Sequence, residues 1–526
     1  MPGVIAGCCL LLLLAFAMLS GAQAQTLRWA ARGDSQGMDP YAFAEGVTHN
    51  LNSLVYDSLV EHDQQQRIVP ALATAWSVSS DGKTWRFTLR RGVSFHDGTP
   101  FSADDVVFSI LRAQRPASAR ATLATRLGTP VRVDAQTVEL RLRDPNPAQL
   151  EMLGSMLIMG RDWTVAHGAE RVADAGKREE SPIARQAMGT GRFMLSSREP
   201  GVRTVLTRNP KWWGRFEGNV ERLVFLPIDN DATRTAALIA GDLDFTQDLS
   251  TQDVPVLAMN PAIRLLTGPE SRVIYLGLDQ FRDELPDSGV TGRNPFKDRR
   301  VREALFDALD AERLRTTVMR GLSVPTACMA SAETDCLQTE LAARPPADLE
   351  RARALLAQAG YAQGFALVLD CPNDRYVNDR ALCVAIAGML SRVGVRVTVQ
   401  ARSKTQHFPK LRRYESSFFL AGWGGVDDPQ FLLDSVLHSV DPVRQKGDAN
   451  YARYADLELD RLIDTAGVEM DAPRRAELIR AVQRRVFEQH YYLPLHRQAI
   501  TWAARKNVRA VITPNNVVRP DWIHID

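Results

Sequence analysis

ALATAWSVSSDGKTWRFTLRRGVSFHDGTPFSADDVVFSI, residues 71–110, is the stretch that decides the fold. Apolar and polar residues alternate over 85–90, and Asp81-Gly82 comes shortly before them, which is the pattern of a half-buried β-hairpin. Ser102 and Asp105 stand three residues apart ahead of an apolar run, so they predict a capping box at the start of an amphipathic helix. A hairpin, a tight turn and a helix are therefore expected in that order.

The same stretch carries a resemblance to a known family. Its pattern W-x-x-S-x-DG-x-x-x-x-F-x-LR-x-x-V-x-FHDG-x-P-x-x-A-x-DV-x-x-S is similar to the family 5 extracellular solute-binding proteins, the dipeptide and oligopeptide receptors of bacterial ABC importers. GTGRF at 189–193 and NPKWW at 209–213 resemble two further elements of that family. The resemblance implies an α/β fold of the periplasmic-binding-protein type II (cluster C), with two lobes, an extra domain and a ligand cleft between the lobes.

A chain of 526 residues is too long for one hydrophobic core and should divide into two or three domains. The resemblance suggests where the divisions fall. We expect a signal peptide at 1–24, lobe I at 25–60, 185–268 and 500–526, an extra domain inserted in lobe I at 61–184, and lobe II at 269–499. A chain that begins and ends in one lobe crosses between the lobes three times, which favours hinge bending over free tumbling.

The first 24 residues differ from the rest. Val4 to Leu19 is almost entirely apolar but short for a membrane span, and Ala22-Gln23-Ala24 is a small-residue cleavage site, so a secretory signal peptide and a periplasmic location are expected. No Lys or Arg precedes the apolar run, which departs from the usual pattern, and Ile5 to Cys8 imitates a lipoprotein cleavage box, which is the alternative. The net charge of +2 creates no field that would attract nucleic acid.

Four cysteines remain after the predicted signal peptide, namely Cys328, Cys336, Cys371 and Cys383. An even number in an oxidising compartment favours disulfides. Three pairings are possible, and short loops favour Cys328 with Cys336 and Cys371 with Cys383. A metal site is the competing interpretation, but no C-x-x-C spacing or nearby histidine pair supports it.

A βαβ unit is predicted between 365 and 399, because two apolar strands flank a helical pattern that ends at Gly394. Open parallel sheets bind ligands beyond the carboxyl ends of their strands, so the loop 371–379 is a candidate site. Arg375 and free backbone N–H groups at the helix start would suit a carboxylate or another anion. The alternative is a surface ion pair between Arg375 and a neighbouring aspartate of the loop.

The segment LAGWGGVDDPQF, residues 420–431, resembles the family's GW-x-x-(D)-x-x-DP element, in which backbone groups pair with an extended peptide and an aspartate anchors its amino terminus. The resemblance gives backbone and stacking roles to Gly422, Trp423, Gly424 and Gly425. Its spacing is shorter than in the peptide receptors, so Asp427 is only a candidate for the amine anchor. The loop that contains Glu45 and Gly46 is either part of the same cleft or a surface turn.

Recognised catalytic patterns are missing, including G-x-S-x-G and H-E-x-x-H. We therefore expect a monomeric receptor without a cofactor that captures a peptide or other small solute and delivers it to an inner-membrane ABC permease with its ATPase subunits. Relatives in the resembled family also carry nickel chelates, glutathione, opines and oligosaccharides, so these solutes stay open. A periplasmic hydrolase on the same scaffold is the alternative of another class.

Overall fold

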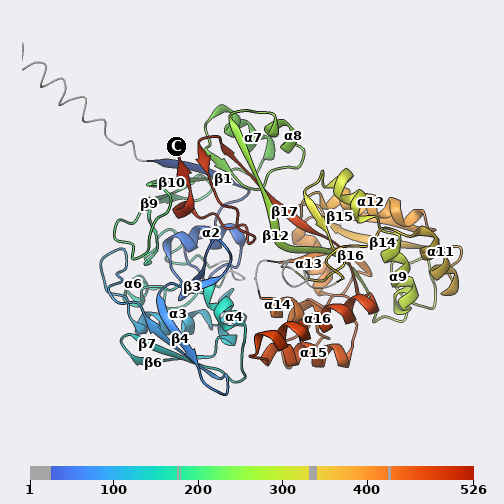
Figure 1. Ribbon diagram of the computed structural model, residues 1–526, viewed down its shortest axis with the longest axis horizontal. Helices are drawn as coiled ribbons and strands as arrows, with labels where there is room; N and C mark the ends of the chain where they lie inside the picture. Colours follow the sequence, from blue (N-terminus) through green and yellow to red (C-terminus); the bar gives the residue numbers. More distant parts are fainter. Residues whose placement is uncertain (1–24, 175–176, 178, 331–339, 425–427) are drawn as a thin grey trace, which may run out of the picture.

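The computed structural model describes residues 25–174, 177, 179–330, 340–424 and 428–526 (Figure 1). The predicted signal peptide at 1–24 lies outside these ranges, as do Cys336, Gly425 and Asp427. Within them, no helix has both the length and the apolar character needed to span a bilayer.

The hairpin at 71–90 forms as predicted. β4 (Ala73–Val78) and β5 (Thr84–Leu89) pair antiparallel, and the sheet continues through β7 (Thr137–Arg141) to β6 (Thr129–Asp134). Gly82 has φ 71°, and a Cβ atom there would lie 2.9 Å from Cβ of Pro145. Only glycine therefore fits this turn without strain.

The capping box is also confirmed. α3 (Ala103–Ala113) begins after Ser102, whose Oγ accepts a hydrogen bond from the backbone N–H of Asp104 at 3.3 Å. Asp105 accepts the backbone N–H of Ser102 at 2.9 Å. Val106 and Ile110 on the inner face of the helix are completely buried, so the amphipathic pattern packs α3 against the core.

A large mixed sheet passes through the whole molecule (Figure 1). Its strand order is β15-β14-β16-β12-β17-β11-β1-β10-β9-β8, and β13 pairs with β17 at the side of this path. Its strands are β1 (Thr26–Ala31), β8 (Phe193–Glu199), β9 (Arg203–Arg208), β10 (Arg222–Pro227), β11 (Phe245–Thr246), β12 (Ile263–Leu278), β13 (Ser323–Pro325), β14 (Phe365–Pro372), β15 (Val395–Arg402), β16 (Phe418–Gly424) and β17 (Tyr492–Arg505). Two-stranded sheets are formed by β2 (Val60–His62) with β3 (Ile68–Pro70) and by β18 (Val508–Arg509) with β19 (His524–Ile525).

β12 and β17 are long antiparallel strands that join the two halves of the molecule in Figure 1. Their register is interrupted between Pro269 and Val273, within the segment where a change of lobe is expected. On one side, Trp29, Phe87 and Trp502 belong to a single hydrophobic cluster that includes the four-stranded sheet. On the other side, successive residues of β16 point into two different clusters, so both faces of the sheet are buried there.

The predicted βαβ unit is confirmed. β14 and β15 are parallel and in register from Phe365↔Val395 onward, and α12 (Asp379–Ser391) connects them. Cys371, at the end of β14, is bonded to Cys383 in α12, as predicted. The predicted bond between Cys328 and Cys336 involves a residue outside the described ranges.

The helix α2 (Gly46–Val55) follows the first strand. It begins after Glu45, which caps it, and it ends before Tyr56, whose backbone is extended. The remaining helices and helical turns are α4 (Ala121–Arg126), α5 (Gln149–Gly154), α6 (Arg161–Ala166), α7 (Asp231–Ala240), α8 (Val254–Ala258), η2 (Pro295–Lys297), α9 (Arg299–Asp307), α10 (Ala311–Arg313), η3 (Leu314–Val318), α11 (Leu349–Gln358), α13 (Lys404–Arg412), α14 (Gln430–Leu432), η4 (Leu433–Leu437), α15 (Leu457–Val468), α16 (Ala472–Gln489) and η5 (Pro520–Trp522).

Two buried histidines make stability depend on pH. Burial lowers the pKa of both His490 and His496 to about 3. Below about pH 6.5 the unfolded chain binds protons that the folded chain does not, so the free energy of unfolding falls as the pH drops. We expect each histidine to cost roughly 1 kcal/mol at pH 5.5 relative to pH 7.5.

Denaturation with urea at several pH values measures this loss. The variant His490→Asn keeps a residue that tolerates the left-handed backbone at φ 47°. Combined with His496→Gln, it should clearly reduce the pH dependence between pH 7.5 and 5.5, while His49, whose pKa burial also lowers to about 3, keeps its contribution. A double variant that is as sensitive to acid as the wild type would contradict the assignment to these two residues.

Candidate functional site

A cavity of about 1310 Å³ lies along the middle of β12 and β17. Its wall includes Glu270 and Arg272 from β12 and the residues 498–501 from β17. The loop 373–378 after β14 and the start of α2 close it from other directions. Segments from both ends of the large sheet therefore meet around one space, which is the usual position of a ligand site in an open α/β sheet.

Glu270 and Arg272 form the polar floor of this cavity. Nε of Arg272 lies 2.9 Å from Oε1 of Glu270, and both side chains are mostly buried. Gln498 donates to Oε2 of the same carboxylate at 2.7 Å, and the backbone N–H of Val377 donates to Gln498 at 3.0 Å. These hydrogen bonds connect the loop after β14 to both β12 and β17.

Arg375 is one of the cations of the cavity wall, and it lies in the loop that follows the strand β14. Among the described residues, its guanidinium group has no hydrogen-bond or ion-pair partner and lies beside the ring of Tyr376. Burial, followed by repulsion from Arg272, lowers the pKa of Arg375. Glu270 pairs with Arg272 and not with Arg375, so an anion bound at Arg375 would offset the local repulsion between the two guanidinium groups. The alternative of an ion pair between Arg375 and Asp374 or Asp379 is not what the structure has.

Several backbone N–H groups before and at the start of α12 already have partners within the protein, and the predicted role of the helix start toward an anion stays a prediction. The carboxylate of Asp379 accepts the backbone N–H groups of Arg375, Tyr376 and Arg380, at 2.8 to 3.1 Å. The N–H of Val377 is bonded to Gln498, as described above. These donors hold the shape of the loop, so the Arg375 side chain is the group of the loop 373–378 that can bind an anion.

The predicted glycine segment continues β16 instead of leaving the sheet. Gly422, Trp423 and Gly424 pair with β12, in the register Arg272↔Gly424. β14 pairs with β16 only at Phe419, so the other edge of β16 is open beyond that residue. At this edge, the hydroxyl of Tyr376 accepts the N–H of Gly422 at 2.8 Å and donates to its carbonyl at 3.2 Å. Gly424, two residues further, lines the cavity.

Trp423 lies apart from the other predicted site residues. Its side chain is half-buried and packs against the hydrophobic cluster that contains Phe419 and Leu433, and it is not part of the cavity wall. Gly425 and Asp427, which follow it, are outside the described residues. The predicted roles of these three residues toward a solute stay predictions.

Glu45 and Gly46 line the cavity, but Glu45 also has a structural role. Its carboxylate caps α2 by accepting the N–H groups of Val47 at 3.0 Å and Thr48 at 2.9 Å. The cavity thus brings together Glu45, Gly46, Arg375 and Gly424 from the predicted set. Glu270, Arg272 and Gln498 were missed, although a charged pair in the middle of the apolar run 263–278 was a usable signal.

Comparison with known proteins agrees with this architecture. The family model described as "Bacterial extracellular solute-binding proteins, family 5 Middle" matches residues 67–442, which is more than half of the chain. The chain belongs to this family. The dipeptide-binding protein of Escherichia coli (strain K12) is 26% identical over 531 residues, covering 95% of this chain and 94% of its own.

Two further proteins show how broad the likeness is. Heme-binding protein A of Haemophilus influenzae is 27% identical over 492 residues, covering 87% of this chain and 84% of its own. The crystal structure of the ABC transporter substrate-binding protein CtaP from Listeria monocytogenes superposes with a TM-score of 0.82 at 18% identity, covering 95% and 99% of the two chains. The predicted fold class is therefore confirmed.

This family 5 solute-binding protein is the substrate-binding component of an ABC importer. Its relatives are named for the solutes that they bind, and the cavity offers groups that suit binding: the cation of Arg375 and the backbone edge at Gly424. In the described part of the chain, no group of three or more His, Cys, Asp or Glu side chains could hold a metal ion.

Proposed function

We propose that this protein captures a di- or oligopeptide with a free terminal carboxylate and delivers it to a permease in the inner membrane. The periplasm is the compartment that suits such a receptor and its disulfide. The observation that carries the proposal is the unpaired Arg375 beside the open edge of β16. The cation would hold the carboxylate, and the glycine backbone of the edge would pair with the extended peptide chain.

A thermal-shift screen tests the proposal, because a ligand that binds only the folded protein raises its melting temperature. The panel contains dipeptides, the same dipeptides as carboxyl-terminal amides, glutathione, an opine, an oligosaccharide and a nickel chelate. We expect the free dipeptides to raise the melting temperature and the amides to have little effect. A shift only with the oligosaccharide or the nickel chelate would reject the peptide class.

Recovery of the solute separates a receptor from a hydrolase. We expect a dipeptide incubated with excess protein to be released intact on denaturation, as mass spectrometry would measure. Stoichiometric appearance of free amino acids would instead establish peptide hydrolysis.

We also propose that 25–60, 185–268 and 500–526 form lobe I, that 61–184 form an inserted extra domain, and that 269–499 form lobe II. The cavity would then lie between the lobes, and closure would bury the solute by differential contacts. One contact supports a closing motion. Nη2 of Arg126 in α4 donates to Oδ2 of Asp434 in η4 at 2.7 Å, and the same guanidinium lies over the ring of Phe431 (Figure 1 shows α4 near α14).

Replacing Arg126 with alanine should weaken solute binding about fivefold, because the closed form loses a partly buried ion pair and a cation–π contact. Isothermal titration measures the affinity, and small-angle scattering measures whether the unliganded protein becomes more open. Arg132→Ala is the matched control, since Arg132 forms an exposed ion pair with Asp104 inside the same region, 3.3 Å apart. Equal effects of the two variants would contradict a closing role for Arg126.

A further inference from the structure

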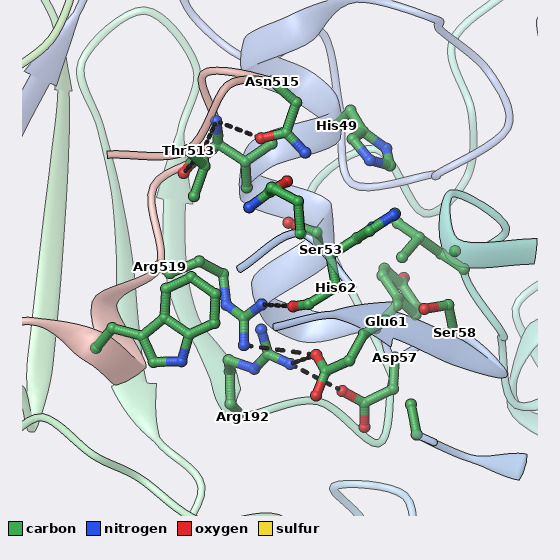
Figure 2. Close-up of a pocket in the computed structure, with 17 residues that line it drawn as sticks. His49, Ser53, Asp57, Ser58, Glu61, His62, Arg192, Thr513, Asn515 and Arg519 are labelled. Carbon is green, nitrogen blue, oxygen red and sulfur yellow. Dashed lines mark hydrogen bonds and ion pairs between the residues drawn. The ribbon is translucent and has the colours of Figure 1, made fainter. Parts of the chain in front are cut away.

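A second, smaller cavity of about 90 Å³, whose lining residues are drawn in Figure 2, shares part of its wall with the solute cavity. We call it the side pocket. Its wall is formed mainly by α2 and the segments that follow it, together with Arg192 and the residues 513–522 near the chain end. The two cavities share the lining residues His49, His62, Gly154, Asn515 and Val517. A solute in the larger cavity therefore has direct access to the side pocket, which has room for the end of one side chain.

The side pocket has two carboxylates and two guanidinium groups in its wall, and ion pairs connect them to further carboxylates behind it. Arg192 pairs with Glu61 at 2.7 Å and lies 3.9 Å from Asp57 and 3.7 Å from Asp521. Arg519 pairs with Asp521 at 2.7 Å and lies 3.5 Å from Glu61. His62 contacts Glu151 at 2.8 Å. Even with His62 protonated, these ion pairs of the described residues join four carboxylates to three cations, and two of the carboxylates, Asp521 and Glu151, lie behind the wall.

Two buried hydrogen-bond acceptors in the wall lack a donor among the described residues. Oδ2 of Asp57 accepts from Thr190 at 2.9 Å and from Trp213 at 2.7 Å, but Oδ1 accepts from nothing. Among the described residues, Oδ1 of Asp57 is the only buried carboxylate oxygen that lacks a hydrogen-bond donor. Oε1 of Gln66, which also lines the side pocket, is the second acceptor. Burial raises the pKa of Asp57, as expected for an incompletely compensated carboxylate.

We infer that the side pocket is a subsite for a cationic end group of the solute, an ammonium or a guanidinium carried on a short apolar chain. Such a group adds a positive charge beside these carboxylates and donates to Asp57 and Gln66 at the same time. This inference rests on the proposed function, because it assigns the peptides preferred by the same receptor: those with a lysine or an arginine side chain.

The first test compares peptides of matched size. Isothermal titration is carried out with Ala-Lys and Lys-Ala against Ala-Met and Met-Ala, which lack the charge. We expect the better lysine peptide to bind at least about tenfold more tightly than its methionine counterpart, as hydrogen bonds to a charged group imply. Gln66→Met should reduce this ratio about fivefold, and Gln66→Glu should increase it.

Gln136→Met is the matched control, because Oε1 of Gln136 is also a buried acceptor without a donor but lies in the turn between β6 and β7. It should leave the lysine-to-methionine ratio unchanged. Equal affinities for the lysine and methionine peptides in the wild type, or a preference for glutamine peptides, would overturn the inference.

A second test does not need a peptide, so it still examines the side pocket if no peptide binds. Failure of every peptide to bind would refute the proposed function but not the side pocket's preference for a cation. n-Butylammonium chloride is compared with sodium chloride at equal ionic strength, with the melting temperature as the readout. We expect an additional rise with n-butylammonium in the wild type and in Gln136→Met, and a smaller rise in Gln66→Met. No additional rise in any of the three, together with no lysine preference, would mean that the side pocket holds only water.

Discussion

Replacing Arg375 with alanine is expected to weaken the binding of a free dipeptide about 100-fold, the largest effect that any cavity residue should have. Its side chain is exposed on the wall of the open cavity, has no partner in the described part of the chain and is repelled by Arg272, so closure over a solute would bury the new pair. A solute carboxylate would pair with it away from water. Loss of one partner of such a buried charge pair typically costs about 2 to 5 kcal/mol, because the other charge stays desolvated. Isothermal titration with Ala-Ala measures the change.

Three comparisons make this result specific. Arg375→Lys keeps the charge but loses the planar fork of donors, so an intermediate affinity is expected. Arg396→Ala removes one exposed positive charge on β15 and should change the affinity less than twofold. The wild type should prefer Ala-Ala over its carboxyl-terminal amide, and Arg375→Ala should lose that preference. If the variant still prefers the free acid, another group must bind the carboxylate.

The fold could be predicted to a large extent because its strongest signals are local. The alternation over 85–90, the turn at Gly82 and the capping box at Ser102 each specify a short piece of backbone, and all three are present in the structure. The βαβ unit was equally readable, since an apolar strand of that kind needs a helix to return parallel. The disulfide between Cys371 and Cys383 follows from the same unit.

The site was less predictable because it is assembled from distant segments. Glu270 and Gln498 are 228 residues apart in sequence but joined by a hydrogen bond of 2.7 Å, and no local pattern reveals such a contact. Asp379 was read as a possible partner of the Arg375 side chain, whereas it binds the backbone N–H groups of the loop. Spacing alone does not distinguish these two uses of an aspartate.

Trp423 illustrates the same limit for an apolar residue. The resemblance gives the glycines and the tryptophan backbone and stacking roles toward a solute, whereas in the structure the segment extends β16 and the half-buried ring packs on a hydrophobic cluster. Residues on a strand alternate between its two faces, so one residue more or less of strand decides whether a side chain meets the cavity or the core. The sequence did not specify where β16 ends.

The site also depends on an ion pair that lies behind it. Arg112 in α3 and Asp39 ahead of α2 are both almost fully buried, with Nη1 to Oδ1 at 2.9 Å and Nη2 to Oδ2 at 2.6 Å. Nε of Arg112 donates to the carbonyl of Ala169 at 2.7 Å, and Ser181 donates to Asp39 at 2.9 Å. This network fixes the chain just before Glu45, and so it positions one wall of the cavity.

We expect Arg112→Met to lower the free energy of unfolding by about 3 to 5 kcal/mol, since it leaves the carboxylate of Asp39 buried without its cation. Urea denaturation measures the loss. The double variant Arg112→Met, Asp39→Leu removes both charges and should recover most of the stability, because the remaining cost is mainly repacking. Arg86→Ala breaks an exposed pair with Glu139 and should cost less than about 1 kcal/mol. If Arg112→Met were no worse than Arg86→Ala, the buried pair would not be holding this wall.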